Sequence, residues 1–324
     1  KLEQENLAKI IYPNKPITQE NLGEELEKIN PHIVIAAPRE YTGEIMSRAP
    51  NLIAVIRHGI GVDSIDFNYC KEKNIYLINT PNAPSKSVAY DVLEKILLML
   101  SNSPQTNQKI KEGEWPIETR KDPRNITVGL IGAGRIPLAF AEISKNLGFK
   151  KIIAFDIFDE ALERIEKLGV ETTKDLNKIL TETDIISMHT PLNEHTHHLI
   201  SEKEFEIIGD NKMLINTSRG GTVKTEALIN WLNNNPNSKA ALDVLEQEPP
   251  NKDNSLLQLP IQKLYLTPHL GASTDKGLEH MAEGCMIAAD AIIRNNGLIK
   301  EETIQELQTT QPDNMFNIVI NREK

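Results

Sequence analysis

The sequence predicts an α/β protein built on parallel sheets. Short apolar runs that are typical of strands alternate along the chain with longer stretches in which apolar residues recur at helical spacing. Such alternation is typical of units in which a helix joins two parallel strands. A glycine-rich turn directly follows one run and precedes a helical pattern. The runs that we expect to form strands are residues 32–37, 51–56, 75–80, 126–132, 151–156, 184–190, 212–218, 240–245 and 263–269.

Two long helical patterns indicate where the chain passes between domains. In the first, Val88, Val92, Ile96 and Leu100 recur at helical spacing before the polar segment SNSPQTNQ. The second, residues 277–294, is closed by Asn-Asn-Gly. A chain of 324 residues is large enough for two domains with separate cores. We expect residues 1–101 and 277–324 to form one domain, and residues 102–276 to form the other.

The composition excludes several classes of partner. The net charge of −10 disfavours nucleic acid and anionic membranes, because either would require a basic face, although a local basic pocket for a small anion stays open. The first residues are charged, and no apolar run reaches membrane length, so we expect a cytoplasmic protein. Cys70 and Cys285 are too few for a disulfide framework, and we interpret both as buried or spectator thiols.

The glycine-rich turn has the layout of a dinucleotide-binding fingerprint. Gly132 and Gly134 follow an apolar run and precede a helical pattern, where glycine lets the backbone approach a pyrophosphate at the start of a helix. The next strand ends in Asp156, at the spacing expected of an acid that binds the adenosine ribose. The carboxylate would repel the ribose 2′-phosphate of NADP, so it favours NAD. Arg135 is the residue that could weaken this preference. Pro137 departs from the fingerprint, but proline is tolerated in a first helical turn.

Three charged residues follow further strands. They are Arg219, Glu248 and His269. Ligands of open α/β sheets bind at the carboxyl ends of the strands, so we expect these side chains to face one crevice. Arginine can clamp a carboxylate and polarise a carbonyl, and histidine can donate a proton near neutral pH. The set therefore predicts hydride transfer between nicotinamide and a 2-keto acid, with Glu248 orienting His269.

The chain strongly resembles the D-2-hydroxyacid dehydrogenase family over nearly its whole length. The resemblance implies a flavodoxin-like substrate domain formed by both chain ends, a Rossmann-like NAD-binding domain inserted between them, and a homodimer built through the nucleotide domains. The matching segments are, in family order, RHGIGVDSID, NTPNA, GLIGAGRI, HTPL, INTSRGG, ALDVLEQEPP and PHLGAST.

The resemblance also implies roles for individual residues. Arg219 would bind the substrate carboxylate, His269 would be the acid/base, and Glu248 its partner. The backbone of the RHGIG segment would face the substrate. The residues implied for the cofactor are Gly132, Gly134, Arg135, Ile136, Asp156, Thr190, Thr217, Asp243 and Gly271, and those implied for the substrate are Arg57, His58, Gly59 and Ile60.

Within the family, HLGAST and the position of Arg57 most resemble the phosphoglycerate dehydrogenase branch. Arg57 is then a candidate for a substrate phosphate, which makes 3-phosphoglycerate a candidate substrate. Two departures concern this branch assignment, since residues 89–91 read Ala-Tyr-Asp where the family has alanine-glutamate, and Pro137 replaces a glycine. Neither departure involves the arginine, glutamate and histidine that carry the chemistry.

The remaining histidines are interpreted as structural. His195, His197 and His198 gather in the segment NEHTHHLI, but no cysteine or carboxylate pattern in the sequence completes a metal site, so we expect no metal. We expect His189 to pack beside the cofactor.

Two alternatives to the phosphoglycerate hypothesis stay open. A glyoxylate or hydroxypyruvate reductase would use the same residues on a substrate without phosphate. An NAD-sensing binding protein that resembles the C-terminal-binding corepressors would keep the same residues without depending on turnover.

Overall fold

The computed structural model describes residues 5, 7–13, 15–81, 84–295 and 317–320. Its contacts divide the chain into two compact units, Lys1–Pro84 with Asp275–Lys324, and Ser85–Thr274. The first boundary lies after Pro84, whereas the sequence placed it after residue 101. The difference arises because the helix of residues 85–101 buries its apolar side in the core of the second unit. Residues 296–316 and 321–324, which the sequence assigned to the first domain, lie outside the described residues.

The first unit is built on a sheet with the strand order β1-β2-β3-β11. The first three strands are parallel, whereas β11 pairs with β3 in the antiparallel direction, an element that the sequence did not predict. Its elements are α1 (Leu22–Ile29), β1 (Ile33–Ala36), α2 (Gly43–Ser47), β2 (Ala54–Arg57), α3 (Phe67–Glu72), β3 (Tyr76–Asn79), α11 (Asp275–Arg294) and β11 (Asn317–Ile320).

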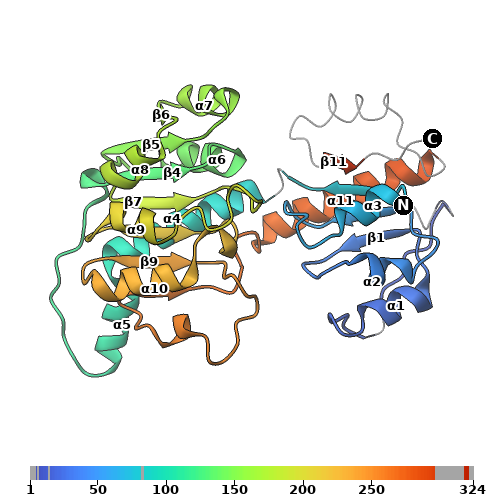
Figure 1. Cartoon of the computed structure of the whole chain (residues 1–324), viewed down its shortest axis with the longest axis horizontal. Helices are drawn as coiled ribbons and strands as arrows, with labels where there is room; N and C mark the ends of the chain where they lie inside the picture. Colours follow the sequence, from blue (N-terminus) through green and yellow to red (C-terminus); the bar gives the residue numbers. More distant parts are fainter. Residues whose placement is uncertain (1–4, 6, 14, 82–83, 296–316, 321–324) are drawn as a thin grey trace. The chain divides into compact units, whose positions relative to one another are not determined.

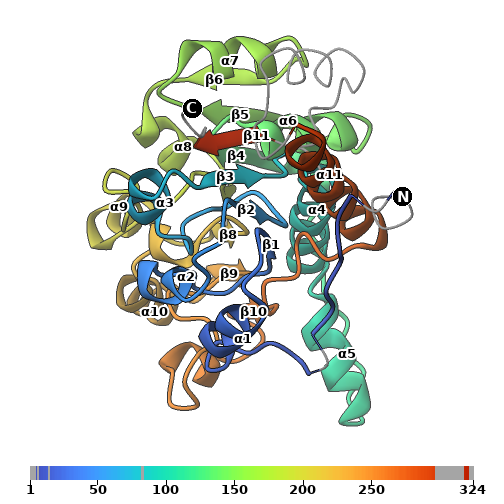
Figure 2. The same cartoon turned by 90° about the vertical axis from the view of Figure 1, so that its right-hand side faces the viewer.

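Local sequence explains why these helices begin where they do. The side chain of Thr42 accepts a hydrogen bond from Ile45 N at the start of α2, and Asp66 accepts one from Tyr69 N at the start of α3. Apolar strand residues are buried on both faces of the sheet, with α1 to α3 on one face and α11 on the other (Figure 2). Cys70 and Cys285 lie in these two cores, and burial raises the pKa of their thiols to about 11 and about 12.

The second unit contains a seven-stranded parallel sheet with the order β10-β9-β8-β7-β4-β5-β6 (Figure 1). This is the doubly wound arrangement that the alternating pattern predicted. Its elements are α4 (Ser85–Ser101), α5 (Ser103–Lys111), η1 (Pro123–Asn125), β4 (Thr127–Ile131), α6 (Arg135–Ser144), β5 (Lys151–Phe155), α7 (Asp159–Glu166), β6 (Glu171–Thr173), α8 (Leu176–Glu182), β7 (Ile185–Met188), α9 (Glu202–Ile208), β8 (Met213–Asn216), η2 (Gly220–Thr222), α10 (Thr225–Asn234), β9 (Lys239–Leu242), η3 (Ser255–Gln258) and β10 (Leu264–Leu266).

Two hydrophobic cores sandwich this sheet. Residues of α4, α6 and α7 pack on one face, and residues of α8, α9 and α10 pack on the other. The central strands β4, β7 and β8 are buried throughout, as their continuous apolar runs require. None of the helices in the described part of the chain is both long and apolar enough to cross a membrane.

Candidate active site

The residues of the second unit that the sequence predicted for catalysis or cofactor binding follow the carboxyl ends of neighbouring parallel strands. Because these ends meet at one edge of the sheet, residues far apart in sequence gather there. Gly132 follows β4, Asp156 follows β5, Thr190 follows β7, Thr217 and Arg219 follow β8, Asp243 and Glu248 follow β9, and His269 and Gly271 follow β10.

The glycine-rich turn after β4 depends on the absence of side chains. Gly132 has φ +103°, and a Cβ there would lie 3.0 Å from the His189 carbonyl group. A Cβ on Gly134 would meet nothing within 4 Å, so the backbone there borders open space. α6 begins at Arg135, directly after Gly134, which places Pro137 in the first turn, where its missing N–H is not needed. The turn can therefore present backbone amides to an anion.

Asp156 lies directly against this turn. Its carboxylate accepts a hydrogen bond from Ala133 N at 2.8 Å and another from Phe158 N at 3.0 Å. The negative charge of Asp156 is thus fixed beside the turn, where it disfavours the ribose 2′-phosphate of NADP. Burial and the nearby Arg164 lower the pKa of the Arg135 guanidinium.

Several buried polar atoms at this edge have no hydrogen-bond partner among the described residues. They include the hydroxyl oxygens of Thr190 and Thr217, and both ring nitrogens of His189. Burial lowers the pKa of His189 to about 3, so its ring is neutral at physiological pH. Leaving a buried donor or acceptor unsatisfied costs about 1–3 kcal/mol, and a polar ligand would remove that cost. These atoms and the glycine turn fit a dinucleotide.

Asp243 organises the segment that carries His269. Three consecutive backbone amides donate to this one residue: His269 N to its carbonyl at 2.8 Å, and Leu270 N and Gly271 N to its carboxylate at 2.9 and 2.8 Å. The Thr267 hydroxyl donates to the same carboxylate at 2.5 Å. The family resemblance implied that Asp243 contacts the cofactor, and in the structure its buried carboxylate accepts hydrogen bonds from within the chain.

Sequence reasoning missed the ion pair beside Asp243. Lys95 of α4 is 1% exposed; its Nζ lies 2.5 Å from Asp91 Oδ1 and 4.0 Å from Asp243 Oδ1. Burial raises the pKa of Asp91 in spite of its pairing with Lys95. The sequence signal that could have revealed this ion pair is the position of Lys95, which lies on the core-facing side of the helical pattern among apolar residues. The cation partly offsets the negative charges of the buried Asp243 and the partly buried Asp91.

His269 and Glu248 form the pair that the sequence predicted. His269 Nδ1 lies 2.7 Å from Glu248 Oε2, and both side chains are partly exposed. Leu245 N donates to the other carboxylate oxygen of Glu248 at 2.9 Å, which fixes that side chain. With Nδ1 directed at the carboxylate, Nε2 is the ring atom available to a substrate.

Arg219 lies on the loop after β8, the neighbour of β9. Its carbonyl accepts hydrogen bonds from Asn216 Nδ2 at 2.9 Å and from the Thr222 hydroxyl at 2.7 Å, and its guanidinium donates to Ser218 O at 2.7 Å. The next residue packs tightly, because a Cβ on Gly220 would lie 1.9 Å from the carbonyl carbon of Leu245. The loops that carry Arg219 and Glu248 are therefore in backbone contact.

Residues 93–271 match the family described as D-isomer specific 2-hydroxyacid dehydrogenase, NAD binding domain. The chain belongs to this family. It is 35% identical over 277 residues to the D-3-phosphoglycerate dehydrogenase of Methanocaldococcus jannaschii, covering 84% of this chain and 51% of that protein. It is also 35% identical over 264 residues to the hydroxypyruvate reductase of Thermotoga maritima, covering 80% of this chain and 84% of that protein. The chain thus spans about half the length of the first of these relatives.

A solved structure resembles the fold of this D-2-hydroxyacid dehydrogenase family member over most of its length. The D-lactate dehydrogenase of Aquifex aeolicus, crystallised with NAD and lactic acid, has a TM-score of 0.79 and 26% identity, covering 93% of this chain and 90% of that chain. The family match and the residues at the sheet edge agree on an NAD-binding domain.

The residues predicted for the substrate belong to the first unit. Arg57 donates to Gly61 O at 3.0 Å and to Ala36 O at 3.1 Å, so part of its guanidinium holds the surrounding backbone. Gly59 has φ +140°, and its amide donates to the Thr80 hydroxyl at 2.9 Å. Asn79 Nδ2 donates to Ile60 O. The pKa of His58 is lowered, chiefly by burial. These contacts fix the RHGIG loop, as recognition of an anion by its backbone would require.

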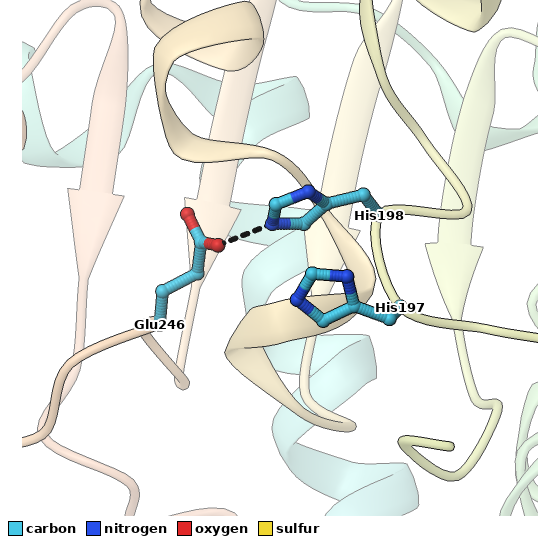
Figure 3. Close-up of side chains that lie close together, drawn as sticks. All are labelled: His197, His198 and Glu246. Carbon is cyan, nitrogen blue, oxygen red and sulfur yellow. Dashed lines mark hydrogen bonds and ion pairs between the residues drawn. The ribbon is translucent and has the colours of Figure 1, made fainter. Parts of the chain in front are cut away.

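The histidine-rich loop contains a group that the sequence did not reveal. His197 and His198 lie beside Glu246, the carboxylate that was missing from the sequence pattern (Figure 3). His195 lies beside Glu194 instead. Burial would raise the pKa of Glu246, but hydrogen bonds from Thr225 and His198 outweigh it and lower that pKa. Glu246 and the histidines are about fifty residues apart, so local spacing gave no signal.

Proposed function

We propose that the protein is an NAD-dependent dehydrogenase that interconverts a D-2-hydroxy acid and its 2-keto acid. The observation that carries the proposal is the hydrogen-bonded pair of His269 and Glu248 at the ligand-binding edge of an NAD-binding domain. A carboxylate that fixes one ring nitrogen and leaves the other towards the substrate is the arrangement expected of a general acid or base.

Each residue has a distinct task in the reduction of the keto acid. Arg219 binds the substrate carboxylate and polarises the carbonyl, because a guanidinium presents paired donors to planar oxygens. His269 donates a proton from Nε2 to the carbonyl oxygen, and Glu248 holds the ring and stabilises the imidazolium before the transfer. NADH supplies the hydride to the carbonyl carbon when it is bound. The reverse reaction takes the same proton back to His269.

The substrate that we favour carries a phosphate, as 3-phosphoglycerate does. Support comes from Arg57 on the RHGIG loop and from the likeness to a D-3-phosphoglycerate dehydrogenase. The equal identity to a hydroxypyruvate reductase supports the smaller substrate, for which Arg57 would have only its structural contacts.

The deciding experiment follows NADH oxidation by the purified protein with phosphohydroxypyruvate, hydroxypyruvate, glyoxylate and pyruvate, with NADPH in parallel. We expect the highest kcat/KM with phosphohydroxypyruvate and NADH, and a selective loss for the phosphorylated substrate in Arg57→Ala. An equal effect of Arg57→Ala on all substrates would support the reductase instead. Tight NADH binding with no turnover of any keto acid would contradict the dehydrogenase and favour an NAD-sensing protein.

We also propose that the protein forms a homodimer through its nucleotide domain. Large apolar side chains of this unit are exposed on α4 and on the segment after α5, with Tyr90 57%, Trp115 82% and Ile117 93% exposed. The segment that returns from α5 to η1 arcs away from the sheet (Figure 1). Large aromatic and aliphatic side chains are common at protein interfaces, and a second copy of the chain would cover these exposed ones.

A further inference from the structure

Two histidines and a glutamate form a cluster outside the proposed catalytic pair. His197, His198 and Glu246 each offer one ligand atom, and these atoms all lie within 4.8 Å of one another. The two rings stack with their centroids 3.8 Å apart, and His198 Nε2 lies 2.6 Å from Glu246 Oε1 (Figure 3). We propose that this cluster binds a divalent transition-metal ion, with Zn²⁺ the ion that suits it best.

Hydrogen bonds fix the backbone of the loop that carries both imidazoles without an ion. His198 adopts a left-handed conformation, φ +52°, and its amide donates to Gly221 O at 2.8 Å. The His197 amide donates to Asn193 O at 2.9 Å. Asn193 also accepts hydrogen bonds from Thr196 through its side chain, which closes the loop on itself. Little backbone conformational entropy is therefore lost when the two rings bind a ligand.

The Glu246 side chain is also held by a hydrogen bond from the backbone. Its Oε2 accepts a hydrogen bond from Thr225 N at 2.8 Å, while Oε1 faces His198. Carboxylate ligands of metal ions are commonly held by a second hydrogen bond of this type, because it fixes the oxygen that coordinates. The cluster thus has three ligand side chains and a supporting contact for its carboxylate.

The ligand set selects a class of ion. Two imidazole nitrogens and one carboxylate oxygen suit Zn²⁺ and its neighbours in the transition series, whereas Ca²⁺ and Mg²⁺ take oxygen ligands. Zn–N bonds of about 2 Å allow two ligand atoms to be at most about 4 Å apart, so a small rotation of the exposed His197 ring completes the geometry. The exposure of His197 and Glu246 gives the ion a path from solvent.

The bound ion would connect two loops of the second unit, and a backbone hydrogen bond already joins one of them to η2. His197 and His198 belong to the loop after β7, Gly221 accepts from His198, and Glu246 belongs to the loop after β9. Glu248 is two residues further on, and its carboxylate accepts from Leu245 N. An ion that binds only the folded state stabilises it by an amount that increases with the logarithm of the free ion concentration above the Kd. We therefore expect Zn²⁺ to raise the melting temperature of the full chain.

The test measures Zn²⁺ binding to the untagged full chain by titration calorimetry, with Co²⁺ absorption as a spectroscopic probe of nitrogen coordination. We expect one saturable site per chain, no binding of Mg²⁺, and a melting temperature that rises with Zn²⁺. His197→Ala and Glu246→Gln should each weaken binding by at least about tenfold, because even indirect partners of metal ligands contribute that much. His195→Ala is the matched control, since His195 is in the same loop but lies beside Glu194.

Three results would overturn the proposal. One is the absence of saturable Zn²⁺ binding, and another is binding that both His197→Ala and Glu246→Gln leave intact. The third is binding that His195→Ala weakens as strongly as His197→Ala does. None of these measurements requires a keto acid or a cofactor, so they test the metal site separately from the dehydrogenase.

Discussion

His269 adopts a left-handed backbone conformation, φ +55°, that places its ring against Glu248. Because general acid catalysis contributes about 10²- to 10⁴-fold, we expect His269→Ala to lower kcat/KM by that factor while NADH still binds. Glu248→Gln should cause a smaller loss, since the ring keeps a hydrogen-bond partner. Steady-state kinetics and NADH fluorescence titration measure both effects. A loss of less than about tenfold in His269→Ala would remove this residue from the acid/base role.

His189 makes the stability of the folded chain depend on pH. Burial lowers its folded-state pKa to about 3, whereas in the unfolded chain it is about 6.5, so below pH 6.5 the unfolded state binds the extra proton. The stability contributed by the neutral ring is complete above pH 6.5 and decreases as the pH falls towards 3. By pH 5 the loss is about 2 kcal/mol.

Urea unfolding of the cofactor-free protein at pH 7.5 and at pH 5 measures this effect. His189→Leu should reduce the difference between the two pH values, because leucine binds no proton in either state. A wild-type difference that survives unchanged in His189→Leu would assign the acid sensitivity to other groups.

At the scale of elements, two adjacent glycines of η2 provide a matched pair of substitutions. A Cβ on Gly220 would lie 1.9 Å from the backbone of Leu245, whereas one on Gly221 would meet the flexible side chain of Leu192 at 3.1 Å. We expect Gly220→Ala to displace the loop of Glu248 and to lower both kcat/KM and the melting temperature. Gly221→Ala should change either quantity only slightly. Equal effects of the two substitutions on activity and melting would refute the proposed backbone contact.

The sequence predicted the elements whose signals are local. Continuous apolar runs identified the parallel strands, and the charged residues after them identified the pair of Glu248 and His269, because parallel strands bring their carboxyl ends to one edge. The approach of Glu246 to His197 could not be read in this way, since it depends on the packing of two separate loops. The ion pair of Lys95 was missed because charge on a helix normally indicates a solvent-facing side.

The boundary of the second unit was missed for a related reason. The helical pattern of residues 85–101 shows that one side is apolar, but it does not specify which core that side joins. The structure places it against α6. β11 lies at the other end of the chain, and its antiparallel pairing with β3 depends on a contact between distant segments.

At the scale of the whole molecule, the exposed side chains after α5 predict the oligomeric state. We expect light scattering to give the mass of a dimer, and we expect the double substitution Trp115→Glu with Ile117→Glu to give a monomer, because two carboxylates in an apolar contact lack partners. Tyr12→Glu is the control, since Tyr12 is 78% exposed in the first unit. A wild-type monomer, or a dimer that resists the double substitution, would contradict the proposed interface.

The three amides that donate to Asp243 attach the segment of His269 to the end of β9. His269, Leu270 and Gly271 lie in an irregular segment, yet each N–H donates to the same residue at the end of β9. Their hydrogens can exchange with deuterium only when this end of the sheet opens, so we expect them to exchange as slowly as those of β9 and far more slowly than those of the loop after α5. Rapid exchange at all three would contradict this coupling. Slow exchange at all three would mean that His269, which we propose as the acid or base, is carried by an irregular segment that opens together with the sheet.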